Sequence, residues 1–430
     1  MIDPELLLRD FDETARRLAR KKVAEAEVAA AREGLLERNR LQQAVEVRRA
    51  ERNALSKQIG ALIGSGRREE GEALKRQVAD DKLELETLEG QLREAEETAR
   101  DRLLRLPNLP DDEAPDGAGE QDNIVLETVG YDPERFAGRT WLPHWEIAEK
   151  LGILDQERAS KITGSMFAAL RGDGSRLLRA LVDLAFRLNS GTYEEWIVPS
   201  MVNSATFTGT GHLPKFGHDA YSIGADDLWL IPTGEVPLTG LHRDEILPAS
   251  AVPLRYMTYT SCFRREAGAA GKDTRGMQRL HEFHKVELVR ICASEDVEAE
   301  FKAMLADAIR PLELLGLPYR ILDLCTGDLT FSSRRVWDIE VYSPGVDRWL
   351  EVSSVGIFGD FQMRRSNMRF RRGPDRKPEF PIALNGSGMA TPRVWAAVLE
   401  HYQQPDGTVL VPDALRPFMG REAIEPRTRE

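Results

Sequence analysis

The sequence contains few of the features that mark secreted, metal-binding or membrane proteins. Its 430 residues include three cysteines, and these lie far apart at Cys262, Cys292 and Cys325. Such spacing excludes a disulfide framework and a zinc site built on C-x-x-C pairs, and it is typical of a reducing cytoplasm. No run approaches the roughly 18 apolar residues of a membrane span. The N-terminus lacks the apolar stretch and cleavage site of a signal peptide. We therefore expect a cytoplasmic protein with no membrane partner.

Net positive charge is also lacking. The chain has 59 Lys and Arg against 71 Asp and Glu, which gives a formal net charge of −12. This balance argues against a protein that coats nucleic acid nonspecifically, but local basic patches still permit nucleic-acid binding. The charged fraction of 30% and the hydrophobic fraction of 41% are ordinary for a globular protein. The length predicts two or three domains.

Proline is absent between residues 27 and 105, and glycine is sparse there. Apolar residues recur every three or four positions in 41–62 and again in 74–99, and "GSGR" at 64–67 supplies a turn between them. The pattern predicts an antiparallel hairpin of two coiled-coil helices, each of about 40 residues and roughly 60 Å long. Such a charged hairpin suits either dimerisation or nucleic-acid binding.

Residues 105–123 are rich in proline, glycine and acidic residues, and they predict a domain boundary. Beyond it, partly alternating segments predict strands, and helices are predicted at about 174–189, 294–315 and 392–404. Few of these strands follow a regular strand–helix–strand order. We therefore predict an α+β fold with helices flanking an antiparallel sheet, and domains at 1–110 and 111–430.

The segment "SCFRREAGAAGKDTRG", residues 261–276, gathers cations in an acidic chain; they are Arg264, Arg265, Lys272 and Arg275. Strand alternation would put Arg264 and Glu266 on one face, with a Gly-rich loop after them. Glycine lets the backbone approach a ligand closely, and arginine offers a bidentate fork, so the segment suits an anion such as phosphate. The alternative is a surface hairpin with incidental salt bridges. The P-loop order G-x-x-x-x-G-K-[ST] is absent.

A second candidate strand, "RLHEFHKVELV", carries a mixed set of side chains on one face. By alternation these are Arg279, His281, Phe283, Lys285 and Glu287. A cation, an aromatic ring and a carboxylate in one row suit a pocket for a charged, ring-bearing ligand, although an exposed strand face would look the same.

The segment "LNGSGMATPRVW" predicts a small-residue turn followed by a helix. Thr391 suits the N-cap and Pro392 the first helical position. Arg393 then lies in the first turn, where the helix dipole disfavours a cation. Either an anionic partner or simple exposure to solvent would account for that placement.

Taken together, these segments resemble a known family. "CFRREAGAAGKDTRG" followed by "RLHEFHKVELV" is similar to the second signature motif of class II aminoacyl-tRNA synthetases, in the form typical of seryl-tRNA synthetases. The segments "LIPTGEVPL", "LDLCTGDLTFSS", "DFQMRR", "LNGSG" and "VPDALRPFMG" occur in the same order along the chain as in that family, and the helical N-terminus carries "RAERNALSKQIG". The resemblance covers nearly the whole chain.

The resemblance implies a class II catalytic domain that joins L-serine to tRNA. The implied reaction uses ATP and Mg²⁺ to form seryl-adenylate and then transfers the seryl group to tRNA(Ser), with tRNA(Sec) left open as a second acceptor. It also implies a homodimer, and it makes the helical hairpin the part that grips the long variable arm of the tRNA.

Roles for individual residues follow from the same resemblance. Arg264 would hold the α-phosphate, Phe283 would stack on adenine, and Arg279 would contact phosphate. The implied catalytic residues are Arg264, Glu266 and Arg393; those for ATP are Arg264, Glu266, Arg279, Phe283, Glu351, Ser354 and Arg393. Those for serine are Thr233, Glu235, Arg264, Glu287, Asn385 and Ser387, and those for the metal are Glu351 and Ser354. The metal pair is three residues apart, so a bulge or turn is required to bring the two side chains together.

Some positions depart from the family's usual pattern. Gly234 stands where alanine is usual, Val355–Ile357 replaces Cys-Ser-Asn, and Pro392 replaces glycine. Arg335–Trp337 replaces Lys-Thr-Tyr, and Thr192 and Trp196 alter the first class II motif. These departures fit neutral drift in a housekeeping enzyme. They also fit a specialised copy that resists an inhibitor or feeds a biosynthetic pathway, a non-catalytic tRNA-binding relative, or a ligase that charges a carrier protein.

Overall fold

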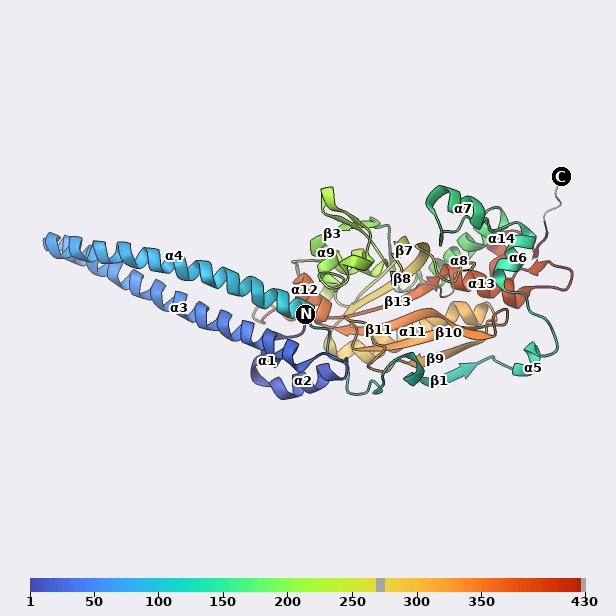
Figure 1. Ribbon diagram of the computed structural model, residues 1–430, viewed down its shortest axis with the longest axis horizontal. Helices are drawn as coiled ribbons and strands as arrows, with labels where there is room; N and C mark the ends of the chain where they lie inside the picture. Colours follow the sequence, from blue (N-terminus) through green and yellow to red (C-terminus); the bar gives the residue numbers. More distant parts are fainter. Residues whose placement is uncertain (268–274, 427–430) are drawn as a thin grey trace. The chain divides into compact units, whose positions relative to one another are not determined.

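The computed structural model describes residues 1–267 and 275–426, which fall into two compact units, Met1–Pro107 and Asn108–Glu430. The first unit is helical (Figure 1, blue to cyan). It consists of α1 (Pro4–Arg9), α2 (Phe11–Ala19), α3 (Glu25–Gly64) and α4 (Arg68–Arg105). The predicted hairpin is confirmed, with helices of 40 and 38 residues. The two short helices that precede it were not predicted.

The hairpin formed by α3 and α4 is held by an apolar seam. Leu41 and Val45 of α3 pack with Leu85 and Leu92 of α4. Exposed ion pairs also cross between the helices, for example Arg49 to Glu89 at 2.7 Å. Since exposed ion pairs contribute at most about 1 kcal/mol each, the seam accounts for most of the pairing.

The second unit is built on an eight-stranded sheet with the order β1-β9-β10-β11-β13-β8-β7-β2. Neighbouring strands are antiparallel except for β2 and β7. The strands are β1 (Ile124–Val129), β2 (Glu194–Trp196), β7 (Leu254–Phe263), β8 (Glu282–Cys292), β9 (Tyr319–Asp323), β10 (Arg335–Ser343), β11 (Arg348–Gly359) and β13 (Ile382–Ala390). With the helices α8 (Asp173–Asn189), α11 (Val297–Leu314) and α13 (Thr391–Tyr402), this confirms the α+β prediction.

Shorter elements surround the sheet. The helices among them include α5 (Pro133–Phe136), α6 (His144–Leu151), α7 (Gln156–Thr163), α9 (Ser204–Gly209), α10 (Glu235–Gly240), α12 (Phe361–Ser366) and α14 (Arg416–Met419). The strands include β3 (Met201–Asn203), β4 (Ser222–Ile223), β5 (Leu228–Leu230), β6 (Ile246–Pro248), β12 (Arg369–Arg371), β14 (Val409–Leu410) and β15 (Ala423–Ile424). In the described part of the chain, no helix is both long and apolar enough to cross a bilayer.

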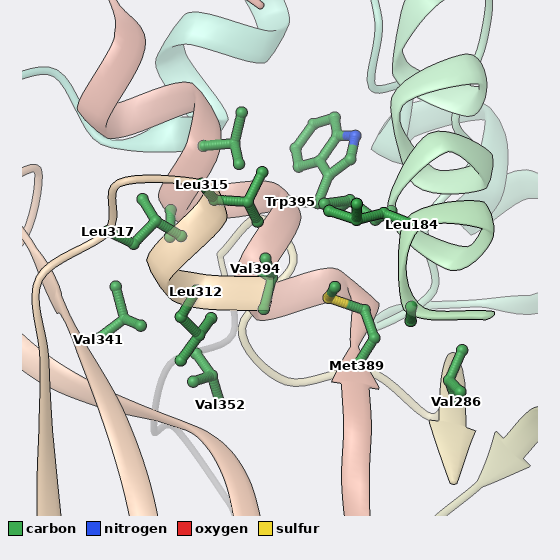
Figure 2. Packing of buried hydrophobic residues seen from close by; sticks show 14 of the residues in the cluster. Leu184, Val286, Leu312, Leu315, Leu317, Val341, Val352, Met389, Val394 and Trp395 are labelled. Carbon is green, nitrogen blue, oxygen red and sulfur yellow. The ribbon is translucent and has the colours of Figure 1, made fainter. Parts of the chain in front are cut away.

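The main core fixes α13 against the sheet. Trp395 of α13 is fully buried beside Leu184 of α8 (Figure 2). Its Nε1 donates to the carbonyl of Gly174 at 3.0 Å. Leu312 of α11 and Val352 of β11 belong to the same cluster. This packing holds the start of α13, which carries Arg393, at a fixed place beside the central strands.

Candidate active site

A cavity of about 590 Å³ is lined by residues of the central strands β8, β10, β11 and β13, by the loops beside them, and by the first residues of α10 and α13. Every residue to which the family resemblance assigns a role in the reaction lies in the lining of this cavity. They are Thr233, Glu235, Arg264, Glu266, Arg279, Phe283, Glu287, Glu351, Ser354, Asn385, Ser387 and Arg393. Residues separated by as much as 160 positions are thus brought together by the order of the strands.

Arg264 lies just after β7, at one end of the cavity. Its backbone N–H donates to the carbonyl of His281 at 2.9 Å, which closes the base of the loop. Its exposed guanidinium lies 5.0 Å from the ring centroid of Phe283. A cation and an aromatic face are therefore available side by side, as a ligand with both an anionic and a ring-shaped part requires.

The prediction that Arg264 and Glu266 share a strand face is wrong. Strand β7 ends at Phe263, and Glu266 has a φ of +52°, so the chain has left the extended conformation. Glu266 instead receives a hydrogen bond from the guanidinium of Arg279 at 2.7 Å. Of the later cations of the 261–276 segment, Lys272 lies outside the described residues, and Arg275 is exposed.

Strand β8 begins later than predicted, at Glu282, so Arg279 and His281 precede it. Phe283, Lys285 and Glu287 line the cavity as alternation indicates. His281 does not line it, because its backbone N–H pairs with Met166 and its ring contacts the carbonyl of Arg264.

The buried end of the cavity holds two carboxylates and one ammonium group. Glu287 accepts a hydrogen bond from the Thr233 hydroxyl and forms an ion pair with Lys285. The Nζ atom of Lys285 also donates to Thr233 at 2.9 Å. Ser387 lies opposite Glu287 in the β13–β8 pair. The sequence assigned no role to Lys285, although its place in the alternating row of β8 was the available signal.

Glu235, at the start of α10, is the second of these carboxylates. It accepts a hydrogen bond from Nε2 of Gln362 at 2.6 Å, and burial raises the pKa of Glu235 to about 7. Sequence reasoning assigned no role to Gln362, although it lies in the quoted "DFQMRR" segment. The segment "DLWLIPTGEVPL" at 227–238, whose pattern predicts a strand, is a strand only over β5, since α10 begins at Glu235. Pro237 fits there because the first turn of a helix tolerates proline.

The predicted bulge exists in β11. Ile339 pairs with Ser353 whereas Glu340 pairs with Glu351, so Val352 is the additional residue of the bulge. Glu351 and Ser354 consequently both line the cavity, although they are three residues apart. The requirement for a bulge or turn between them is confirmed.

Arg393 lies near the start of α13 and reaches back to β11. Its guanidinium donates to the backbone carbonyl of Glu351 at 2.5 Å and lies 3.3 Å from the Glu351 carboxylate. The predicted N-cap is wrong, because the helix begins at Thr391 and the Thr391 hydroxyl donates to the carbonyl of His284. The predicted small-residue turn is also wrong: residues 384–388 belong to β13, where a Cβ on Gly386 would approach Val355 to 3.0 Å.

The departures from the family pattern differ in where their side chains lie. Val355 and Ile357 are buried in the hydrophobic core, at 0% and 3% exposure, and only Gly356 between them lines the cavity. Gly234 packs tightly, because a Cβ there would lie 2.8 Å from Thr258 and 2.9 Å from Glu287. Among the departures from the family pattern, Val336, Gly356 and Pro392 line the cavity.

Comparisons with known proteins agree along the chain. Residues 221–402 match the family described as "tRNA synthetase class II core domain (G, H, P, S and T)", and residues 1–110 match "Seryl-tRNA synthetase N-terminal domain". The chain is 46% identical over 415 residues to the serine–tRNA ligase of Dehalococcoides mccartyi strain CBDB1, covering 95% of this chain and 97% of that protein. It is 43% identical over 426 residues to the serine–tRNA ligase of Geobacillus kaustophilus, covering 99% and 100%.

A solved structure matches the whole chain. The seryl-tRNA synthetase from Pyrococcus horikoshii, complexed with ATP, superposes with a TM-score of 0.91 at 32% identity and covers 100% of both chains.

Proposed function

Since the chain belongs to the seryl-tRNA synthetase family, we propose that its 590 Å³ cavity is where ATP and L-serine react. The chain is a serine–tRNA ligase, which activates serine with ATP and transfers the seryl group to tRNA(Ser). The observation that carries the assignment of the site is the convergence of all twelve implied residues on one cavity. A non-catalytic relative is not favoured, because these residues remain together.

In the first step, an oxygen of the serine carboxylate bonds to the α-phosphorus of ATP, and the bond to the bridging oxygen breaks to release pyrophosphate. Negative charge grows on the α-phosphate as this happens. The exposed guanidinium of Arg264 is available to stabilise that charge, and Phe283 beside it offers a face for adenine. Arg279 and Arg393 bring two more cations to the cavity.

The buried end of the cavity suits serine. The Glu287 and Glu235 carboxylates would face the ammonium group of the amino acid. Asn385 and Ser387, in β13, would bond its hydroxyl. Because a buried polar pocket left unfilled is costly, such a site would reject alanine strongly.

Glu351 and Ser354 would hold the Mg²⁺ of the reaction, and the surroundings fit a cation. Asp338 lies opposite Ser354 in the β10–β11 pair, and among the described residues its Oδ1 atom is buried without a hydrogen-bond partner. Burial and the nearby charge of Glu351 raise the pKa of Asp338 well above its usual value. Oxygen ligands of this kind are those that Mg²⁺ prefers. When bound, the ion neutralises phosphate charge.

Three further parts of the proposal concern the whole protein. We assign the hairpin to binding of tRNA(Ser), supported by the family match over residues 1–110. We assign a homodimer, supported by the exposed apolar strand β1, in which Ile124, Val125 and Leu126 are 46–50% exposed. Its location would be the cytoplasm, in keeping with three free, buried cysteines.

Serine-dependent exchange of pyrophosphate into ATP, in the presence of Mg²⁺, tests the proposal directly. Arg264→Ala should lower the exchange rate by roughly 10²–10³-fold, the range for loss of one preorganised charge-stabilising group. Arg265→Ala is the matched control, because Arg265 is also exposed and its guanidinium contacts the carbonyl of His218. No exchange with saturating serine, or equal rates in the two variants, would contradict the assignment.

A further inference from the structure

Behind the cavity wall, a fully buried histidine joins segments that are far apart in the sequence. His144, the first residue of α6, is 0% exposed, and Glu400 of α13 is 1% exposed. The Nδ1 atom of His144 lies 2.9 Å from Oε1 of Glu400. The other ring nitrogen, Nε2, lies 2.9 Å from the backbone nitrogen of Met277.

These contacts fix the tautomer of His144. A backbone N–H is a donor only, so Nε2 must accept from Met277 and carries no proton. The single ring proton is then on Nδ1 and is donated to Glu400. The Glu400 carboxylate is itself held by the backbone N–H groups of His144 at 3.0 Å and Gly345 at 3.1 Å, and by the hydroxyl of Ser343.

The peptide unit between Gly276 and Met277 is held at both of its polar ends. Its N–H donates to His144, and its carbonyl accepts from Nε2 of Gln156 at 3.2 Å. Gly276 has a φ of +68°, and a Cβ there would lie 2.1 Å from the ring of His144. Only glycine therefore allows the histidine to approach this peptide so closely.

The next two residues enter the cavity. The carbonyl of Gln278 accepts from Arg393 at 3.4 Å, and its side chain accepts from Arg348 at 3.2 Å. Arg279 is paired with Glu266 at 2.7 Å. The orientation of the 276–277 peptide thus sets the direction in which the chain delivers Gln278 and Arg279 to the site.

We infer that His144 and Glu400 are positioning residues for ATP binding: as the Nδ1-protonated imidazole–carboxylate pair, they clamp the 276–277 peptide so that Gln278 and Arg279 face the phosphates. This inference rests on the proposed function, because it takes the cavity to be the ATP site. Neither residue touches substrate. The serine end is built from Thr233 and from α10, β8 and β13, none of which contains the clamped peptide.

Steady-state exchange kinetics of substituted proteins test the clamp. His144→Leu leaves the Met277 N–H without an acceptor and should raise the KM for ATP about tenfold, with the KM for serine changed less than about twofold. His144→Gln retains an acceptor for that N–H, so its KM for ATP should lie much closer to the wild-type value. A parallel rise in both KM values, or no recovery with glutamine, would overturn the inference.

His401→Leu is the matched control for loss of a buried histidine. His401 is 7% exposed on the same helix, and its Nε2 contacts the carbonyl of Tyr342 rather than the loop. It should lower the melting temperature and leave the KM for ATP unchanged. A rise in the KM for ATP equal to that of His144→Leu would mean that α13 stability alone is responsible.

Two measurements that do not require the exchange reaction separate the clamp from the proposed function. Nitrogen NMR of the histidine rings, with His144 assigned from its absence in His144→Gln, should show a protonated Nδ1 and an unprotonated Nε2; the opposite tautomer would overturn the inference. Calorimetric titration with ATP should show about tenfold weaker binding to His144→Leu. If wild type fails to exchange, the proposed function fails, whereas these measurements still decide the clamp.

Discussion

Gly234 has no room for a side chain, although alanine is usual at this position in the family pattern. An added methyl group would lie 2.8 Å from Cγ2 of Thr258 and 2.9 Å from Cβ of Glu287. Gly234→Ala should therefore displace Glu287 and raise the KM for serine about tenfold, since overpacking of this kind costs about 1–3 kcal/mol. The measurement is pyrophosphate exchange at varied serine concentrations.

The same contact predicts a suppressor. Thr258→Ala removes the Cγ2 atom, so the double variant Gly234→Ala/Thr258→Ala should recover most of the lost serine affinity. Gly191→Ala is the control, because nothing lies within 4 Å of its added Cβ. A double variant no better than Gly234→Ala would show that Thr258 is not the limiting neighbour.

Glu235 should make serine activation depend on pH near neutrality. Burial raises its pKa to about 7, so the carboxylate that would balance the serine ammonium becomes protonated below that pH. The value of kcat/KM for serine should be level above about pH 7 and fall about tenfold per pH unit below it. Glu235→Gln should show a low and flat profile over the same range. A wild-type profile without this break would contradict the assignment.

The raised pKa of Glu235 also has a consequence for stability. Because the folded-state pKa of about 7 exceeds the usual 4.5, the folded protein holds this proton more tightly than the unfolded chain. Stability is therefore lost as pH rises from about 4.5 to 7, by on the order of 3 kcal/mol. Glu235→Gln removes this loss and should melt at a higher temperature than wild type at about pH 8, but not at about pH 4.5. An equal difference at both pH values would contradict the raised pKa.

For individual residues, the family motifs indicated which side chains lie near one another, whereas strand alternation failed where the path of the backbone decides. All twelve assigned residues line the cavity. However, alternation misplaced Glu266, because the chain leaves β7 at Phe263. It could not show that Val355 and Ile357 lie in the core, since the bulge at Val352 shifts which residues of β11 face the cavity.

Among the secondary-structure elements, the hairpin offers the sharpest test. Its apolar cluster of Leu41, Val45, Leu85 and Leu92 lies near the middle of the two helices, and the pair Arg48–Glu84 marks the start of a more exposed distal part. Replacing residues 49–83 with a short turn should keep the cluster and therefore the fold of the helix pair. We expect wild-type rates of pyrophosphate exchange together with loss of tRNA(Ser) charging by at least about 10²-fold, because the phosphate contacts of a tRNA-binding surface dominate affinity.

The control for this truncation is charging by wild type at matched salt concentration, since binding to phosphates weakens as salt rises. If the truncated protein still charged tRNA(Ser), the distal part of the hairpin would not be needed for tRNA recognition. Loss of exchange as well would show that the distal hairpin is needed for more than tRNA.

The boundaries of helices and strands could be predicted best where the sequence pattern is most regular. The two hairpin helices followed from a three–four apolar spacing with only a few polar interruptions and no proline. The start of α13 could not be predicted in this way. Thr391 has a residue type that is typical of an N-cap, but its hydroxyl donates to the carbonyl of His284 instead. Likewise, glycine in "LNGSG" indicates a turn locally, whereas the neighbours β8 and β11 hold it as a central strand.

At the scale of the whole molecule, the order of strands could not be predicted from the sequence. Strand β1 pairs with β9 and β2 with β7, across long separations in the chain. The alternation of side chains along one strand does not indicate which strand pairs with it. Only the class II resemblance indicated how the sheet is assembled. The clamp at His144 is hidden for the same reason, because it joins α6, α13 and the loop before β8.

From the position and composition of strand β1, we predict that two copies of the chain associate through this strand. It is an edge strand of the eight-stranded sheet, and Ile124, Val125 and Leu126 are 50%, 47% and 46% exposed. An apolar edge strand is a template for pairing with another chain, and a charged side chain there opposes it. Wild type should therefore have twice the chain mass of 48.4 kDa by light scattering, and Leu126→Lys should raise the dimer dissociation constant at least about tenfold.

Ile162→Lys provides the comparison, since Ile162 is a 77% exposed apolar residue of α7, outside β1. It should leave the dimer intact. A wild-type mass of 48.4 kDa at all concentrations would contradict the homodimer, whereas equal weakening by the two lysines would place the interface elsewhere. Because the edge of β1 offers both unpaired backbone groups and an apolar surface, a single added charge there should act on association without altering the active-site cavity. Monomeric Leu126→Lys that still exchanges pyrophosphate would separate dimer formation from the chemistry of serine activation.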